Sequence, residues 1–285
     1  MEIRKITKDS PEYPEILRNY ERMPECLYVC GALPDPGLHS VGIVGARACS
    51  AYGRNEAVRF AKALSENGVQ IISGMAYGTD SCAHEGALLG GTPTFAVLGC
   101  GPDICYPASN RKLYENIISS GGGIISEFEP GTPALSYHFP IRNRIISALS
   151  DAVLVIEAKR KSGSLITASY ALEQNKSLFA VPGSLNNPLS AGCNALIYQG
   201  AVPAISPKQL MIDIGIIPDE NNTTPSPALT PDEKKIIAFL YGKESSIDEI
   251  SEALNISLSS LFALITSLSV RGLITEICPG HYTKA

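Results

Sequence analysis

Short apolar runs recur between residue 41 and about residue 205, and this alternation restricts the fold more than any other feature of the chain. The runs are rich in β-branched residues, and longer amphipathic stretches separate them. They begin at Val41, Val69, Pro93, Gly123, Ala152 and Ser177. Alternating strands and helices are typical of βα units with a parallel sheet, and nearly continuous apolar strands require helices on both faces. We therefore expect an α/β fold with a doubly wound, mostly parallel sheet.

The two ends of the chain depart from this pattern. Residues 1–40 are predicted to form an N-terminal arm with a short helix, and residues 41–217 the sheet domain. The stretch 218–230 collects proline, asparagine and threonine, which is typical of a linker. Residues 231–285 show three helical patterns and then two short strands around a Pro-Gly pair. Such a segment predicts a small winged-helix domain.

The third helical stretch of that C-terminal domain, 257–271, is apolar, and Arg271 is its only basic residue. From residue 226 to 285, seven acidic residues stand against five basic ones, which gives a net charge of −2. A helix that reads DNA offers cations, Asn or Gln to phosphates and base edges. The sequence therefore favours a protein-contact or packing role for this domain over DNA contact.

Composition limits the classes of site and of cellular location. The net charge of −5 means that any nucleic-acid contact depends on a local basic patch. The eight cysteines form no CxxC pair and no zinc-type spacing with the four histidines, so we expect neither a metal nor a cofactor. No apolar run approaches the ~20 residues that span a bilayer, and the N-terminus lacks the apolar segment of a signal peptide. We expect a cytoplasmic protein without membrane contact.

Two small-residue loops are predicted at the carboxyl edge of the sheet, each between a strand and a helix. The first carries Gly45 and Arg47 in a GxxGxR spacing, which differs from the GxGxxG dinucleotide fingerprint and disfavours NAD. The second carries Gly74 and Gly78. Free backbone amides at a helix N-terminus bind anions, and an arginine there adds a bidentate phosphate contact. A plain glycine turn with a surface arginine is the alternative for the first loop.

Basic residues gather between residues 138 and 161, where five bases stand against two acids. Phe139 stands in this segment together with Arg142, Asn143 and Arg144. Cations interleaved with aromatic rings suit single-stranded nucleic acid, because the cations contact phosphates and a ring stacks on an unpaired base. We expect both arginines to be exposed cations and Phe139 to be a stacking residue, with a core position for Phe139 as the alternative.

A third loop of the same kind opens the helix expected at 166–174. It contains Lys159, Ser162, Gly163, Ser164 and Thr167. Hydroxyls, backbone amides and a lysine that converge on a helix N-terminus form an anion site. Three such loops at one sheet edge fit a polyphosphate chain better than a small metabolite.

Several blocks of the chain resemble the DprA/Smf family, in the order that this family shows. They are IVGARACSAYG, SGMAYGTDSCAHEGAL, AVLGCGPDICYPASN, SEFEPGT, FPIRNRIISALSDAVLVIEAKRKSGSLITASYALEQ, FAVPG and SAGCNALIYQGA. The resemblance implies an extended Rossmann-like fold that binds single-stranded DNA, forms a homodimer and assists RecA loading in natural transformation and homologous recombination. It also implies a DNA-binding pocket made of Arg47, Phe139, Arg142, Asn143, Arg144, Lys159, Ser162, Gly163, Ser164 and Thr167.

An enzyme of the nucleotide phosphoribohydrolase type is the competing interpretation, because its fold is similar. The motif of that class needs a glutamate three residues after its threonine, and Tyr170 stands at that distance from Thr167. Nothing in the sequence pairs two acids as glycoside chemistry requires. We therefore expect a DNA-binding protein with no catalytic residues and no enzymatic activity.

Overall fold

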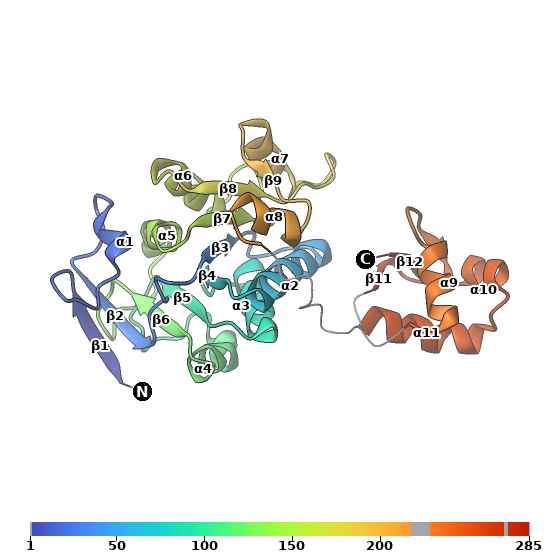
Figure 1. The fold of residues 1–285 in the computed structure, drawn as a ribbon, viewed down its shortest axis with the longest axis horizontal. Coiled ribbons are helices and arrows are strands. Elements are labelled where there is room, and N and C mark those ends of the chain that lie inside the picture. The colour runs from blue at the N-terminus through green and yellow to red at the C-terminus, as the bar shows by residue number, and fades with distance from the viewer. Residues whose placement is uncertain (1, 218–228, 271–272, 285) are drawn as a thin grey trace. The chain divides into compact units, whose positions relative to one another are not determined.

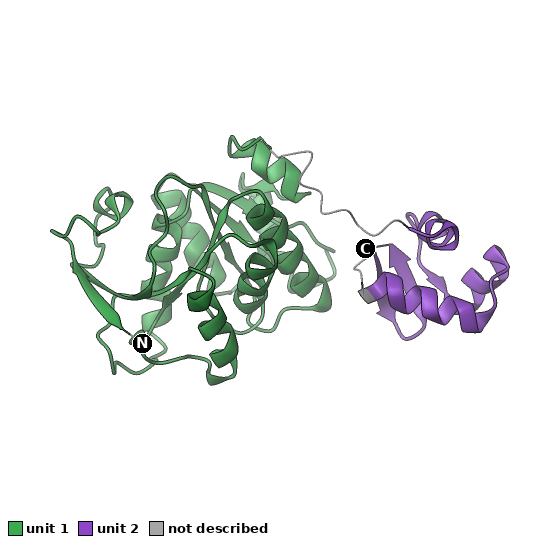
Figure 2. Ribbon diagram, turned by 60° about the horizontal axis from the view of Figure 1, so that its bottom comes forward, with its two compact units in different colours: residues 1–222 green, residues 223–285 purple. Residues whose placement is uncertain are grey.

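The computed structural model describes residues 2–217, 229–270 and 273–284, and the chain forms two compact units, residues 1–222 and 223–285 (Figure 2). The first unit contains a nine-stranded sheet in the order β1-β2-β6-β5-β4-β3-β7-β8-β9 (Figure 1). The strands are β1 (Ile3–Thr7), β2 (Cys26–Gly31), β3 (Ser40–Val44), β4 (Gln70–Ser73), β5 (Thr94–Leu98), β6 (Gly123–Ser126), β7 (Ala152–Val155), β8 (Ser177–Ala180) and β9 (Val202–Pro203). In this sheet only the two pairs that β2 makes, with β1 and with β6, are antiparallel, so the predicted α/β class with a mostly parallel sheet is confirmed.

Helices cover both faces of the sheet (Figure 1). One face carries α2 (Ala51–Glu66), α3 (Thr79–Gly90), α4 (Arg111–Ser119) and α8 (Pro207–Asp213), and the other carries α1 (Glu15–Arg18), α5 (His138–Ala148), α6 (Ser164–Glu173) and α7 (Ala191–Tyr198). Successive side chains of a strand point to opposite faces. In β5, Phe95 and Val97 therefore pack in the layer of α5, whereas Ala96 and Leu98 pack against the layer of α4.

The six predicted apolar strands are β3 to β8. The residues before them, which were expected to form only an arm with a short helix, also form two strands of the sheet. Besides the short helix α1, residues 1–40 supply β1 and β2, which extend the sheet beyond β6. The apolar run of β2, CLYVCG, is a strand signal that the predicted arm did not include. The β1 sequence, IRKIT, has too few apolar residues to be recognised without its partner strand.

The order of the strands reverses at β3. The chain adds β4, β5 and β6 on one side of β3 and then returns to add β7, β8 and β9 on the other side. The loops that leave the carboxyl ends of β3 and β7 therefore run to opposite sides and leave a crevice between them. Open α/β sheets bind their ligands at this reversal point.

The second unit contains the three helices and two strands that the sequence predicts. They are α9 (Pro231–Phe239), α10 (Ile247–Leu254), α11 (Leu258–Val270), β11 (Ile274–Cys278) and β12 (His281–Lys284), and a two-residue strand, β10 (Ser245–Ser246), pairs with β12. Capping boxes begin α9 and α10, formed by Thr230 with Glu233 and by Ser246 with Glu249. The winged-helix assignment stays a prediction. Most of the predicted linker, and Arg271, lie outside the described residues.

In the parts of the chain that the structure describes, no single helix is long and apolar enough to cross a membrane. The pair α10 and α11 passes the same test of length and composition only together, with a bend of 113° between the two helices.

His84 in α3 is an ionisable residue that is fully buried in the core. Its Nδ1 lies 2.8 Å from the hydroxyl oxygen of Thr94, and that hydroxyl donates to the carbonyl of Ile71 at 2.7 Å. The hydroxyl oxygen therefore accepts the Nδ1–H of His84, which fixes the neutral tautomer. Burial, with a smaller contribution from the Arg142 cation, lowers the pKa of His84 to about 3.

This neutral histidine makes the stability of the fold pH-dependent. The unfolded chain binds a proton at His84 as the pH falls below about 6.5, and the folded chain does not until the pH approaches 3. As the pH falls from about 6.5 towards 3, we expect His84 alone to lower the free energy of unfolding by up to ~1.4 kcal/mol per pH unit. Above pH 6.5 the contribution of His84 should be constant.

Urea unfolding of the wild type and of His84→Gln over a pH series measures this effect. The stability difference between the two proteins should shrink as the pH falls from about 6.5 to 4. A difference that stays constant over the series would show that the folded protein protonates His84 normally.

Candidate nucleic-acid interface

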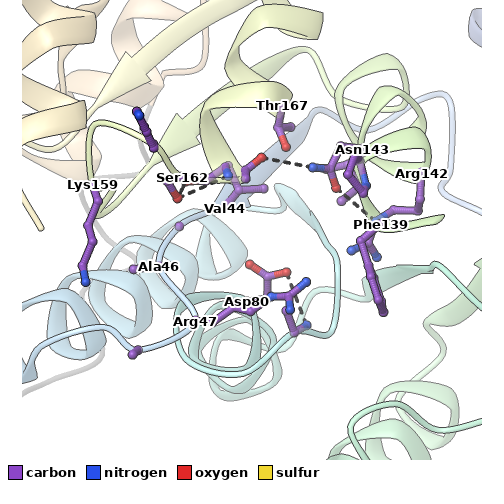
Figure 3. Close-up of a pocket in the computed structure, with 18 of the residues that line it drawn as sticks. Val44, Ala46, Arg47, Asp80, Phe139, Arg142, Asn143, Lys159, Ser162 and Thr167 are labelled. Carbon is purple, nitrogen blue, oxygen red and sulfur yellow. Dashed lines mark hydrogen bonds between the residues drawn. The ribbon is translucent and has the colours of Figure 1, made fainter. Parts of the chain in front are cut away.

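A pocket of about 450 Å³ lies at the reversal point of the sheet, lined by the loops after β3 and β7 and by the N-terminal parts of α5 and α6 (Figure 3). Its lining includes ten of the predicted site residues: Gly45, Arg47, Phe139, Arg142, Asn143, Lys159, Ser162, Gly163, Ser164 and Thr167. Gly74, Gly78 and Arg144 are not part of it. Asp80 and Lys161, which were not predicted as site residues, also line the pocket.

Three cations on the pocket wall are available to a ligand. Arg47, Lys159 and Lys161 are exposed, and the described residues contain no ion-pair partner for any of them. The guanidinium of Arg47 lies 5.1 Å from the ring centroid of Phe139, a cation–π contact that orients it at the pocket. These side chains give an acidic protein a local positive surface.

The N-terminus of α6 presents polar groups to the same space. The hydroxyls of Ser162 and Ser164 lie 2.7 Å apart, and Thr167 stands one turn into the helix. The Oγ1 atom of Thr167 is buried and has no hydrogen-bond partner among the described residues. Buried hydroxyls are nearly always paired, and Thr167 lines the pocket, so a ligand there can supply the missing partner. A helix N-terminus favours an anionic one.

The loop after β3 was expected to offer free amides at the N-terminus of α2. The structure corrects this expectation for the amides of Ser50 and Gly53, which are hydrogen-bonded within the protein. Ser50 caps α2 by accepting the N–H of Gly53, and the Glu157 carboxylate accepts both the N–H and the hydroxyl of Ser50, at 2.8 and 2.6 Å. Glu157 is buried, so its carboxylate occupies the place that an external anion would take. The exposed side chain of Arg47 is the group of this loop that we expect to bind a phosphate.

The loop after β4 also contains an internal carboxylate, that of Asp80, which accepts backbone N–H groups. Oδ2 of Asp80 accepts the N–H of Ala76 at 3.3 Å. Burial raises the pKa of Asp80, and the Arg142 charge and the backbone N–H groups of Ala76 and Gly74 oppose that rise. Gly78 has φ 75°, and a Cβ there would lie 2.5 Å or less from two backbone carbonyl oxygens. Gly74 and Gly78 therefore serve close packing and do not line the pocket.

Arg142 is not the exposed cation that the sequence suggested. It is 3% exposed, and its Nη1 donates to the carbonyls of Gly74, at 2.9 Å, and of Val97. Its Nε donates to Oδ1 of Asn143, whose Nδ2 donates to the carbonyl of Gly163 (Figure 3). Burial lowers the pKa of Arg142 to about 10, which leaves it charged at neutral pH. The expectation of exposure was wrong because the ends of β4 and β5 supply buried acceptors.

Arg144 is also occupied, which is a second correction. Its two Nη atoms bind the Glu127 carboxylate at 2.7 and 2.8 Å, and its Nε donates to the carbonyl of Arg22 at 2.8 Å. The side chain is only 12% exposed. It holds the N-terminal segment against α5, away from the pocket lining.

Phe139 was expected to be either a stacking residue or a core residue, and its ring is partly buried and partly at the pocket. The ring is half-buried, 5.4 Å from the ring of Tyr106 and 5.9 Å from the guanidinium of Arg142 by centroid. A Cβ on Gly99 would lie 2.9 Å from the ring, so the backbone packs directly against it. Since Arg47 also lies over it, the ring supports the cations of the pocket and offers little uncovered surface of its own.

Comparison with known proteins identifies the family. Residues 4–215 match the family model described as DNA recombination-mediator protein A. The chain belongs to this family. The Smf protein of Synechocystis is 34% identical over an alignment of 309 positions, gaps included, which covers 95% of this chain and 77% of that protein. The resemblance to DprA/Smf proteins predicted from the sequence is thus confirmed.

Two solved structures extend the comparison to the fold of this recombination-mediator protein. The X-ray structure of DprA from Streptococcus pneumoniae has a TM-score of 0.70 and 38% identity, and the match covers 75% of each chain. A DprA structure from Helicobacter pylori, described with its single-stranded DNA binding mode, has a TM-score of 0.66 and 30% identity and covers 75% of this chain and 96% of that one. Family membership assigns the chain to DNA processing in recombination.

The geometry separates the two pocket arginines of this recombination-mediator protein. Arg142→Ala leaves the carbonyls of Gly74 and Val97 without a donor, at ~1–3 kcal/mol for each buried group. We expect it to lower the free energy of unfolding by several kcal/mol, whereas Arg47→Ala, which removes an exposed side chain, should change it by less than ~0.5 kcal/mol. Urea unfolding of both variants checks this, and wild-type stability of Arg142→Ala would contradict the structural role.

Proposed function

We propose that the pocket binds single-stranded DNA through its phosphates, with little sequence preference. The observation that carries the proposal is the combination of three unpaired cations, Arg47, Lys159 and Lys161, with the unpartnered hydroxyl of Thr167 in the first turns of α6. Cations and helix N-termini attract phosphates whatever the base. The likeness to the Helicobacter pylori protein supports the same ligand.

The shape of the site supports a single strand over a duplex. Reading a duplex requires a helix or ribbon that enters the major groove. This pocket is instead a crevice between loops, whose lining comes from the residues after β3 and β7 and from α5 and α6. A flexible single strand can follow such a crevice, because its backbone and its unpaired bases are accessible separately.

The alternative of a phosphoribohydrolase finds less support in the pocket. Asp80 is the one acidic residue along the lining that the structure describes, and it accepts an N–H from its own loop. Glycoside-type hydrolysis uses two carboxyl groups on either side of the scissile bond. We therefore propose binding without catalysis.

We also propose that the protein acts as a homodimer and assists the loading of RecA onto the bound strand, in natural transformation or homologous recombination. Both parts of this proposal rest on the resemblance to the DprA/Smf family, and the family's description as a mediator of DNA recombination supports the loading step. RecA filament assembly on protein-coated single strands, with and without this chain, tests the loading step. Multi-angle light scattering tests the dimer.

The phosphate contacts are tested by removing the free cations one at a time. Arg47→Ala, Lys159→Ala and Lys161→Ala should each weaken binding of an oligothymidine. Each should also reduce the slope of log K against log salt by ~0.7 for every phosphate that the protein no longer neutralises. Fluorescence anisotropy over a salt series measures both quantities.

Lys62→Ala is the matched control, because Lys62 is an exposed cation of α2 that pairs with Glu66 outside the pocket lining. It should leave affinity and slope unchanged. If all three pocket variants behave like Lys62→Ala, the strand binds elsewhere and the proposal fails.

The C-terminal unit is expected to contribute little to this binding. It has a net negative charge, and α11 exposes Leu258 and Phe262 but no cation among its described side chains. A chain ending at residue 222 should therefore bind an oligothymidine within a factor of ~3 of the full chain, that is, within ~0.7 kcal/mol. A loss of more than about tenfold in the same anisotropy assay would show that the C-terminal unit contacts DNA.

A further inference from the structure

Three exposed tyrosines follow adjacent strands beside the pocket. Tyr77 follows β4, Tyr106 follows β5 and Tyr137 follows β6, and their exposed fractions are 52%, 43% and 61%. The three strands are parallel neighbours, and β4 is also the parallel neighbour of β3. Their carboxyl ends therefore lie on the same edge of the sheet as the pocket. An aromatic rim continues this edge from Arg47 toward β6.

One ring contact joins the rim to the pocket, and a second ring contact fixes Tyr137. The ring of Tyr106 lies 5.4 Å from that of Phe139, which lines the pocket. Tyr137 packs edge-on against His138 at 4.6 Å, and His138 stacks on Phe128 at 3.9 Å. These contacts hold Tyr106 and Tyr137 in place while leaving part of each ring open to solvent. A preorganised ring loses little conformational entropy when a ligand stacks on it.

The charges at this end of the sheet suit bases more than phosphates. The carboxylate of Asp103 accepts the N–H of Gly131, and that of Glu129 accepts the hydroxyl of Tyr28 at 2.6 Å. Glu127 is paired with Arg144. The free cations Arg47, Lys159 and Lys161 instead lie on the β3 and β7 side. The pocket side of this edge thus carries these three cations, and the β4 to β6 side carries the three tyrosines.

We propose that Tyr77, Tyr106 and Tyr137 form a stacking shelf that binds the unpaired bases of the DNA strand on one side of the nucleotide held in the pocket. This inference rests on the proposed function. Neighbouring strands lie ~4.8 Å apart, so the shelf extends ~10 Å from β4 to β6. A pocket of about 450 Å³ cannot enclose a ligand of that length in addition to its own nucleotide. The shelf therefore accounts for the next nucleotides of the strand.

The test compares oligothymidines of increasing length, across the ~4–16 nucleotides that sites of this kind occupy. Tyr106→Leu and Tyr137→Leu, which keep an apolar side chain of moderate size, should each weaken binding of the longer oligonucleotides about fivefold or more, since one stacked base is worth ~1 kcal/mol at least. The shortest oligonucleotides should bind as they do to the wild type. The salt slope should not change, because neither substitution removes a cation that binds a phosphate.

Tyr198→Leu is the matched control, since Tyr198 is 93% exposed at the end of α7 and does not line the pocket. Because the chain has no tryptophan, quenching of its tyrosine emission by bound oligothymidine gives a second measurement. Quenching should be smaller in Tyr106→Leu and Tyr137→Leu than in Tyr198→Leu. Tyr106→Phe and Tyr137→Phe should bind like the wild type, because stacking needs the ring and not the hydroxyl.

The outcomes separate the shelf from the pocket. If Arg47→Ala weakens binding while Tyr106→Leu and Tyr137→Leu bind every length like the wild type, the shelf is wrong and the proposed function stands. If the tyrosine variants weaken binding of the shortest and longest oligonucleotides equally, the rings support the pocket itself and the shelf is again wrong. If neither set of variants changes binding, both proposals fail.

Discussion

The buried guanidinium of Arg142 is the interaction on which the geometry of the site depends. It joins the ends of β4 and β5 to α5 through the carbonyls of Gly74 and Val97. Taking a charge out of water costs several kcal/mol, and here carbonyl dipoles and the charge of Asp80 offset that cost. Because Phe139 and Asn143 lie on the same helix turn, their positions follow from that of Arg142. Glycine at position 74 is required for the same reason, since a Cβ there would lie 2.6 Å from the guanidinium.

Internal carboxylates determine where the protein can accept an anion. Glu157 occupies the N-terminus of α2, and Asp80 occupies the loop before α3. Of the three predicted anion loops, the one before α6 leads to Thr167, whose buried hydroxyl has no partner among the described residues. The exposed cations gather around that loop. A chain with a net charge of −5 can therefore present one defined electropositive spot.

The sequence predicts the position of the site better than the role of its residues. The apolar runs of β3 to β8 and the small-residue loops after them determine which edge of the sheet carries the pocket, so ten of the predicted residues line it. Arg142 and Arg144 were assigned the wrong exposure because the acceptors that bury them, Val97 and Glu127, come from distant strands and loops. The unpartnered hydroxyl of Thr167 depends on tertiary packing in the same way, and no local pattern signals it.

The carboxylate of Glu157 has a kinetic consequence for any anion in the pocket. A loop whose helix terminus is already hydrogen-bonded needs no ligand to hold its shape, so binding requires little ordering there. The same carboxylate removes one source of attraction, and the remaining cations, Arg47, Lys159 and Lys161, are exposed and exchange readily with counterions. Together these properties favour fast arrival and short residence times, which are the properties that the proposed transfer of the strand to RecA requires.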